Sequence, residues 1–292
     1  VTVVVGAIIV TSGFESFDPS IKREYHYGDF LNVVTSMDYE RLLCATGPYE
    51  GEILRASDKK HPKKIAWVQC VGSRNKRLDQ DYCSSICCMF ALKEAVLAKE
   101  KGGPDTETTI FYMDMRTFGK DHFRYFEKAV EKGVRLVRCR VQQVHADTDG
   151  SLKIRYFDQE SNEFKVETFD MTVLSTGQTP FAEHKNFSEI LSLNLNEQRL
   201  LPVDDLNKVR LGKPGVFICG SFMGLTDISE AVSSGIAAAG EAAKTLAALD
   251  VLKVDEAEEQ PQHTSTNADT ESAQLEIVFC KGFKDKEGED LD

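Results

Sequence analysis

Four cysteines that lie close together constrain this chain more than any other feature of its sequence. They are half of its eight cysteines and fall between Cys70 and Cys88, in the spacing C-x12-C-x3-C-C. The last two are adjacent, and one peptide step of about 3.8 Å is shorter than the usual Cα separation in a disulfide. Disulfide pairing therefore explains the stretch poorly, whereas clustered thiolates are typical ligands of a soft metal centre.

The spacing also indicates which kind of metal centre to expect. Structural zinc sites usually combine two C-x2–4-C pairs, and this stretch lacks a second pair. We expect a strand at Ile65–Val68 and a helix over Tyr82–Lys99, where apolar residues recur every three or four positions. The last three cysteines would fan around the first turns of this helix, while the first ends the strand. This arrangement favours a four-cysteine iron–sulfur cluster, with zinc and a structural or redox thiol cluster as alternatives.

Strands and helices alternate around the cysteines, which predicts an α/β fold with a parallel, doubly wound sheet. The central strands are expected at 65–68, 108–113 and 134–141, and the intervening helices at 82–99 and 120–132. A hairpin at 152–157 and 164–169 precedes a strand at 171–174. We also expect strands at 1–5, 6–10 and 214–221, a helix at 36–45 capped by Ser36, and an Ala/Gly-rich helix at 231–249.

Three of the expected strands end in small residues. Thr11-Ser12-Gly13 and Thr176-Gly177 follow two of them, and Gly220-Ser221 follows the third. Such endings let a ligand approach the backbone closely, although many are merely turns. The helix that opens at Asp227-Ile228 offers free N–H groups to an anionic ligand, unless its first residues only cap it. These junctions resemble the domain junctions of two-dinucleotide-domain flavoproteins such as the thioredoxin reductases.

The net charge of −12 is placed unevenly along the chain. Lys253–Asp292 carries twelve acidic and four basic residues, a net of −8, and we expect an acidic linker there. Leu275–Cys280 looks like the first strand of a further domain, with Cys280 packed, free or a metal ligand. No basic excess indicates nucleic-acid binding, and no apolar run approaches the roughly 20 residues of a membrane span. Unpaired clustered cysteines suit the cytoplasm, and a start at Val1 inside an expected strand indicates a piece of a longer protein.

Together these motifs resemble the A subunit of heterodisulfide reductase and its relatives, including the flavin subunits of the quinone-interacting membrane-bound oxidoreductase complex. The matching stretches cover residues 1 to about 250 and are Gly6–Phe14 with Phe17–Pro19, Val68–Arg74, Tyr82–Lys93, Tyr112–Lys120 and Gly220–Val232. The resemblance implies a thioredoxin-reductase-like electron-transfer protein that contains FAD and works with other subunits. It also implies a [4Fe–4S] cluster at Cys70, Cys83, Cys87 and Cys88.

The resemblance implies four segments. Residues 1–60 and 181–252 would belong to a flavin domain whose N-terminal half is missing, and 61–180 to a pyridine-nucleotide-like domain that carries the cysteines. Residues 253–292 would be the linker and the start of a further domain. The family's G-x-G-x-x-G loop and ferredoxin-type C-x2-C runs are absent from this sequence, and Gly220-Ser221 stands where thioredoxin reductases carry Gly-Asp. We therefore expect the isolated chain to bind flavin weakly or not at all, and to be inactive by itself.

The cysteines occupy the place of a nucleotide-binding glycine turn, which favours one-electron transfer between flavin and cluster over hydride transfer. Lys93 and Arg74 are candidate cations beside the flavin or the cluster, or else solvated side chains. Thr11, Ser12, Gly13, Thr176, Gly177, Gly220, Ser221, Asp227 and Ile228 are the other candidate cofactor contacts. Two alternative functions stay open: a truncated NAD(P)H-dependent disulfide reductase and a zinc- or thiol-stabilised interaction module.

Overall fold

The computed structural model describes residues 5–147, 149–182, 184–201, 203 and 207–248. The chain divides into two compact units. Thr11–Pro202 and Gly220–Val232 form the one that we call the sheet unit, and Val1–Val10, Val203–Cys219 and Ser233–Asp292 form the second unit. The expectations for residues 1–4 and for the acidic segment 253–292, including the strand at Leu275–Cys280 and Cys280 itself, lie outside the described residues. The four segments expected from the sequence stay a prediction.

The sheet unit is built on seven strands in the order β3-β9-β4-β5-β6-β7-β8. Neighbours from β3 to β6 are parallel, and β6, β7 and β8 form an antiparallel meander. The parallel strands predicted from the alternating pattern are therefore confirmed, within a sheet that is mixed as a whole. The strands are β3 (Val33–Thr35), β4 (Lys64–Val71), β5 (Glu107–Tyr112), β6 (Arg135–Ala146), β7 (Leu152–Asp158), β8 (Glu163–Phe169) and β9 (Met171–Thr176).

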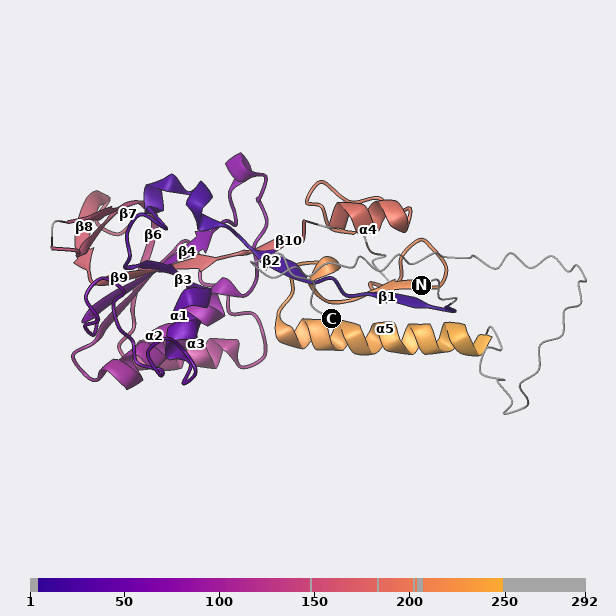
Figure 1. The fold of residues 1–292 in the computed structure, drawn as a ribbon, viewed down its shortest axis with the longest axis horizontal. Coiled ribbons are helices and arrows are strands. Elements are labelled where there is room, and N and C mark those ends of the chain that lie inside the picture. The colour runs from indigo at the N-terminus through magenta and orange to yellow at the C-terminus, as the bar shows by residue number, and fades with distance from the viewer. Residues whose placement is uncertain (1–4, 148, 183, 202, 204–206, 249–292) are drawn as a thin grey trace, which may run out of the picture. The chain divides into compact units, whose positions relative to one another are not determined.

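Three helices cover one face of this sheet: α1 (Ser36–Leu43), α2 (Cys87–Gly102) and α3 (His122–Glu131) (Figure 1). Trp67 from β4, Leu92 from α2 and Ile110 from β5 are completely buried between helices and sheet. The meander and an N-terminal segment enclose a second core on the other face, around Phe111 and Tyr156. Because side chains alternate along a strand, β4 and β5 supply both cores.

The N-terminus of α1 shows how local sequence sets a helix boundary. The Thr35 hydroxyl accepts a hydrogen bond from the Asp38 N–H at 3.1 Å, and the Asp38 carboxylate accepts the Thr35 N–H at 2.9 Å. This is a reciprocal capping box, which satisfies two backbone donors that the helix leaves free. The cap is Thr35, and the prediction that Ser36 caps this helix was wrong because Ser36 is already helical.

Several short elements of the sheet unit were not predicted. Strand β2 (Phe14–Ser16) pairs antiparallel with β10 (Gln178–Pro180), and α4 (His184–Ile190) follows. The single turns of 3-10 helix are η1 (Pro19–Ile21), η2 (Arg23–Tyr25), η3 (Lys76–Leu78) and η4 (Gly220–Phe222). Strands and turns of three residues carry too little periodicity to be recognised from the sequence.

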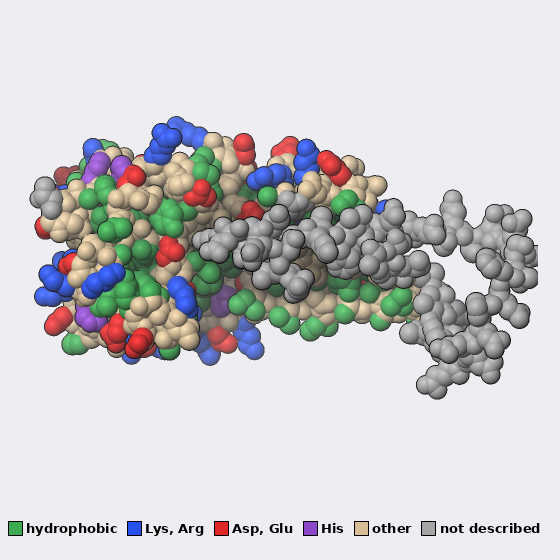
Figure 2. Space-filling view, in the orientation of Figure 1, with side chains coloured by type: hydrophobic (Ala, Val, Ile, Leu, Met, Phe, Trp, Pro, Cys, Tyr) green, Lys and Arg blue, Asp and Glu red, His purple; other side chains and the backbone are tan. Residues whose placement is uncertain are grey.

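In the second unit, β1 (Ile8–Val10) pairs in parallel with β11 (Val216–Ile218). Helix α5 (Ile228–Ala248) is divided between the two units at Ser233. Ile228, Val232 and Ile236, four residues apart in turn, are exposed along α5, where Figure 2 shows hydrophobic side chains in a row. No helix among the described residues combines the length and the apolar character that crossing a membrane requires.

Candidate metal centre and flavin junction

The first cysteine lies where β4 leaves the sheet. The pairing of β4 with β9 shifts register between Val68 and Val71, and Cys70 lies within this irregularity with a left-handed φ of 60°. Such a backbone conformation is uncommon for a residue with a side chain and turns Cys70 out of the regular strand. Gly72, two residues after Cys70, has a φ of 80°. A Cβ on this residue would lie 2.0 Å from the Phe17 ring, so only glycine fits.

The loop after β4 returns the chain to Cys70. The Arg74 N–H donates to the Tyr82 carbonyl at 2.8 Å, and the Asn75 N–H donates to the Gln80 carbonyl at 2.7 Å. These bonds close a narrow loop, so Cys83 comes back beside the end of β4. The predicted helix over Tyr82–Lys99 instead begins at Cys87, because Ser85 has a left-handed φ of 63°. Cys83 therefore does not lie on the helix, and its predicted placement in the first turns of this helix was wrong.

Cys87 and Cys88 open α2, and both are buried. The Cys87 thiol faces the Thr176 carbonyl at 3.7 Å, and the Cys88 thiol faces the Asp114 carbonyl at 3.9 Å. The four predicted cysteines line one small pocket, which is completed by Ser73, Arg74, Ser85, Asp114 and Arg116. Among the described residues, no three His, Cys, Asp or Glu side chains are arranged to hold a single metal ion.

In the absence of a metal, burial raises the pKa of three of the four thiols. It raises the pKa of Cys70 to about 11, with the neighbouring Cys88 thiol as a further cause. Burial is also the main cause of the raised pKa values of Cys87 and Cys88. Buried thiols are neutral at pH 7, so a bound metal centre would have to displace their protons. The Ser85 N–H, 3.4 Å from the Cys83 sulfur, is positioned to donate to a thiolate.

Of the two candidate cations, only Arg74 lines the pocket. Its guanidinium donates to the Asp114 carboxylate at 2.7 Å, which lowers the pKa of that carboxyl group. Lys93 does not line the pocket, and its ammonium pairs with the Glu40 carboxylate of α1 at 2.9 Å. The role of Lys93 at a cofactor stays a prediction, whereas Arg74 has the position that the cation hypothesis requires.

The Thr176-Gly177 ending of β9 is in contact with the cysteine pocket. The Gly177 N–H donates to the Val71 carbonyl at 2.8 Å, and its own carbonyl accepts the Phe17 N–H at 2.9 Å. A Cβ on Gly177 would lie 2.3 Å from the Ser84 hydroxyl oxygen, in the loop between Cys83 and Cys87. Gly177 thus lies between the cysteine loop on one side and the segment that follows Thr11-Ser12-Gly13 on the other.

The remaining predicted junction residues also lie in the sheet unit. Gln178, directly after Gly177, donates from its amide to the Thr226 carbonyl at 3.3 Å, which connects β10 to the turn before α5. That turn follows Gly220 and the buried Ser221, and Asp227 caps α5 by accepting the Glu230 N–H at 2.8 Å. Ile228, 80 % exposed, has no polar side chain to offer, and Thr11 is also exposed.

Three buried polar atoms at these junctions have no hydrogen-bond partner: Ser12 Oγ, Gln178 Oε1 and Thr226 Oγ1. Buried polar groups in folded proteins are nearly always hydrogen-bonded, so we expect each of these atoms to have a hydrogen-bond partner. Hydroxyl and amide groups beside strand ends that carry glycine suit a polar cofactor that approaches the backbone. The residues present are therefore compatible with the flavin that the junctions predict.

His184 belongs to this region and was missed from the sequence. It is 1 % exposed, its ring stacks on Phe222 at 3.7 Å between centroids, and neither nitrogen meets the geometry of a hydrogen bond. Burial lowers the pKa of its imidazole, and the Gly13 backbone lies close enough to counter part of that shift. No local pattern marks this histidine, because the residues around it come from three distant parts of the chain.

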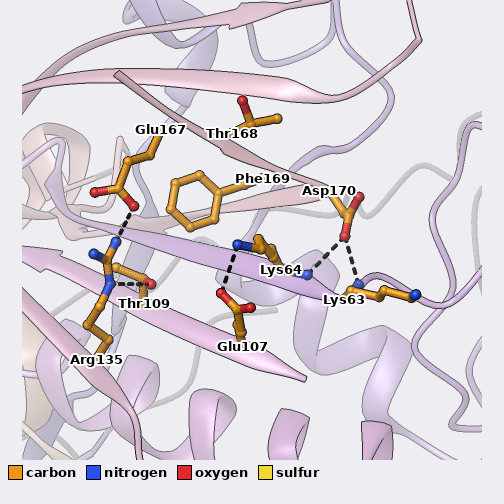
Figure 3. A pocket seen from close by; sticks show the side chains of 9 residues that line it. All are labelled: Lys63, Lys64, Glu107, Thr109, Arg135, Glu167, Thr168, Phe169 and Asp170. Carbon is orange, nitrogen blue, oxygen red and sulfur yellow. Dashed lines mark hydrogen bonds and ion pairs between the residues drawn. The ribbon is translucent and has the colours of Figure 1, made fainter. Parts of the chain in front are cut away.

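A second pocket opens at the amino ends of β4, β5 and β6, away from the cysteines (Figure 3). Ion pairs cross it: Lys64 binds Glu107 at 2.9 Å, and Arg135 binds Glu167. The Asp170 carboxylate accepts the N–H groups of Lys63 and Lys64 at 2.7 and 2.9 Å. Except for the Lys63 ammonium, these charges are paired within the protein, and the pairs connect the meander to the parallel strands, so we assign this pocket no ligand.

Comparison with curated proteins finds similar chains in methanogens. The iron-sulfur A subunit of a CoB–CoM heterodisulfide reductase of Methanopyrus kandleri is 38 % identical over 257 residues, which cover 85 % of this chain and 38 % of that protein. The A subunit of an H2:CoB–CoM heterodisulfide, ferredoxin reductase of Methanothermobacter marburgensis is 36 % identical over 248 residues, covering 82 % and 37 %. The chain thus spans less than two fifths of the length of these relatives. No protein-family model matches it.

Solved structures with a similar fold include two thioredoxin reductases. The enzyme of T. acidophilum matches with a TM-score of 0.52 at 16 % identity, covering 84 % of this chain and 66 % of that one. The Lactococcus lactis enzyme matches with a TM-score of 0.53 at 19 % identity, covering 83 % and 66 %. The fold expected from the sequence and the resemblance on which it rested are both confirmed.

Proposed function

Because the chain is homologous to a segment of the heterodisulfide reductase A subunit, we propose that it is an electron-transfer module. In this proposal single electrons are transferred between a flavin at the strand-end junctions and a [4Fe–4S] cluster at Cys70, Cys83, Cys87 and Cys88. The module would act in the cytoplasm as part of a larger oxidoreductase with further subunits. The names of the relatives support this, since they describe A subunits of reductases.

One observation carries the proposal: the Thr176-Gly177 junction, predicted to contact flavin, touches the residues that form the cysteine pocket. The Thr176 carbonyl faces the Cys87 thiol at 3.7 Å, and Gly177 packs directly against Ser84. Two redox groups bound on either side of this backbone segment would lie close to each other. Such close spacing suits electron transfer, because the protein's task in such a site is to position the groups and tune them.

The residues of the cysteine pocket fit an iron–sulfur cluster in number and chemistry. Four thiols from two segments surround one space, and the Ser85 N–H and the Arg74 guanidinium supply polar and positive groups around it. A bound [4Fe–4S] cluster would supply a centre that accepts and releases single electrons. Burial of Cys87 and Cys88 excludes water from the helix side, and hydrogen bonds to the sulfurs would raise the potential of the centre.

The junction residues would hold the flavin by their free polar atoms. Ser12 Oγ, Gln178 Oε1 and Thr226 Oγ1 are buried without partners, and a polar ligand would satisfy them. A bound flavin would supply the step between paired and single electrons. A hydride-transferring nicotinamide site is less well supported, because the β4–α2 turn carries cysteines in place of a glycine fingerprint.

Anaerobic reconstitution with iron and sulfide tests the metal assignment. We expect iron and sulfide to bind in equal amounts, about four of each per chain as a [4Fe–4S] centre requires, together with an EPR signal after reduction. Cys87→Ser should lose most of this iron, whereas Cys139→Ser should keep it, because Cys139 is buried on β6 outside the pocket. Stoichiometric zinc with no reducible centre would refute the cluster and support the alternative of a zinc-stabilised module.

Titration with FAD tests the flavin assignment separately. We expect weak binding that quenches flavin fluorescence and is reduced at least threefold in Thr226→Val, which removes one unpaired hydroxyl with little change in shape. Thr168→Val is the matched control, since Thr168 lies in the ion-paired pocket on the other side of the sheet unit. Equal affinity of both variants for FAD would count against these junctions as the flavin site.

A further inference from the structure

Asp114 is the only acidic residue among the described residues that line the cysteine pocket. It follows β5, two residues after that strand ends at Tyr112. An iron–sulfur cluster held by four thiolates is negatively charged, and its negative charge increases when it accepts an electron. A free carboxylate beside such a centre would oppose reduction, because like charges repel. The side chains that bind Asp114 therefore determine the electrostatic environment of an added electron.

Two arginines neutralise this carboxylate. One of its oxygens accepts a hydrogen bond from the Arg74 guanidinium at 2.7 Å, and the other accepts from the Arg138 guanidinium at 3.2 Å. The three side chains meet because β4, β5 and β6 are neighbouring strands, and Arg138 of β6 lies opposite Tyr112 at the end of β5. Since two cations surround one anion, the group keeps a net positive charge beside the cysteines.

The two arginines differ in their position relative to the cysteines. Arg74 lines the pocket and its side chain is 23 % exposed, whereas Arg138 is not among the described residues that line it and is 59 % exposed. Arg74 binds Asp114 through Nη2. Its other terminal nitrogen, Nη1, is buried and has no hydrogen-bond partner of normal geometry among the described residues. Buried N–H groups are nearly always hydrogen-bonded, so Nη1 is available to an acceptor in the pocket.

Cys70 is the acceptor that the surroundings of Arg74 favour. Burial raises the pKa of the Cys70 thiol, and the Arg74 guanidinium opposes this rise, so the two groups are close to each other. Arg116, the other cation that lines the pocket, lies beside Cys88. A hydrogen bond from a guanidinium to a thiolate joins two charged groups and belongs to the strong class. Because reduction adds negative charge to the cluster and its sulfurs, such a bond would be stronger in the reduced state.

We propose that Arg74, which binds Asp114 through Nη2, donates through Nη1 to the Cys70 sulfur and thereby raises the reduction potential of the cluster. The inference rests on the proposed function, because it requires a centre at the cysteines that changes its charge. In the reduction, the flavin or an added reductant loses one electron and the cluster gains it. No covalent bond forms or breaks, so Arg74 acts only by stabilising the reduced state.

The midpoint potential of the full chain, reconstituted with iron and sulfide, tests this role. EPR follows the cluster during anaerobic titration with dithionite. Arg74→Gln removes the charge inside the pocket, and its matched control Arg138→Gln removes the same charge from the other oxygen of Asp114. We expect Arg74→Gln to lower the equilibrium constant for reduction about tenfold, a fall of about 59 mV for one electron. Arg138→Gln should lower it less than about threefold, because exposed ion pairs have small effects.

Arg74→Lys separates the hydrogen bond from the charge. Lysine keeps the positive charge but lacks the planar fork that binds two acceptors at once, so we expect a potential between those of wild type and Arg74→Gln. Iron content is measured for each protein before its potential. If Arg74→Gln loads no iron, the comparison of Arg74→Lys with wild type decides the question.

The outcomes separate this role from the redox assignment itself. A wild-type chain that loads no reducible cluster would overturn the proposed function. If the cluster loads but Arg74→Gln and Arg138→Gln have equal potentials, Arg74 has no special position and the inference is refuted. A wild-type potential in Arg74→Lys would also refute it, because charge alone would then account for the effect.

Discussion

Gly177 offers a direct test of the contact between the flavin junction and the cysteine loop. A Cβ on this residue would lie 2.3 Å from Ser84 Oγ, 3.3 Å from Ser73 Cβ and 3.4 Å from the Gly72 carbonyl. Ser84 is completely buried and cannot move into solvent. Gly177→Ala must therefore displace the Ser84 hydroxyl, by rotation of that side chain or by a shift of the cysteine loop, and overpacking of this kind costs about 1–3 kcal/mol. We expect the free energy of unfolding to fall by about 2 kcal/mol and iron loading to fall with it.

A double-mutant cycle identifies the responsible contact. Ser84→Ala removes the closest atom, and the two remaining neighbours are only slightly tighter than ordinary van der Waals contacts. The double variant Ser84→Ala/Gly177→Ala should therefore recover more than half of the lost stability, a coupling energy of about 1–2 kcal/mol. Chemical denaturation followed by circular dichroism, with iron analysis of the same four proteins, measures both effects. Unchanged stability of Gly177→Ala, or no recovery in the double variant, would refute the contact.

Three further predictions concern the helices around the site. Burial raises the pKa of Glu94 well above 4.5, so the folded chain keeps a proton that the unfolded chain releases above that pH. As the pH rises from about 5 toward the folded-state pKa, wild type should lose about 1.4 kcal/mol of stability per pH unit relative to Glu94→Gln. The same pH dependence of the free energy of unfolding in both proteins, measured by denaturation, would contradict this. Trp67→Phe removes the indole N–H that donates to Glu94 at 2.7 Å in the core, so urea denaturation should show a loss of about 2–4 kcal/mol; a loss below about 1 kcal/mol would contradict a buried hydrogen bond. Thr35→Ala removes the capping box of α1 and should cost about 1 kcal/mol, while Thr35→Ser, which keeps the hydroxyl, should be nearly neutral in the same assay.

The candidate site was only partly predictable from local patterns. The spacing of the cysteines identified the four cysteines among the residues that line the pocket, but Cys83 was assigned to a helix that begins four residues later. The left-handed conformation of Ser85 causes this difference, and that of Cys70 turns the first cysteine out of its strand. Helical periodicity does not reveal them, because neither residue is a glycine and both conformations are sustained by the surrounding packing.

Sequence alone determined the parallel sheet, the order of the main strands and helices, and the group of cysteines. Each of these follows from residue patterns that repeat within a few positions, and local backbone preferences are sufficient to produce them. The tertiary structure alone decided that Gly177 packs against Ser84, that His184 stacks on Phe222, and that Arg74 and Arg116 both line the cysteine pocket. These contacts join residues up to about a hundred positions apart, and they form only because burial of both faces of the sheet fixes the strands in one order.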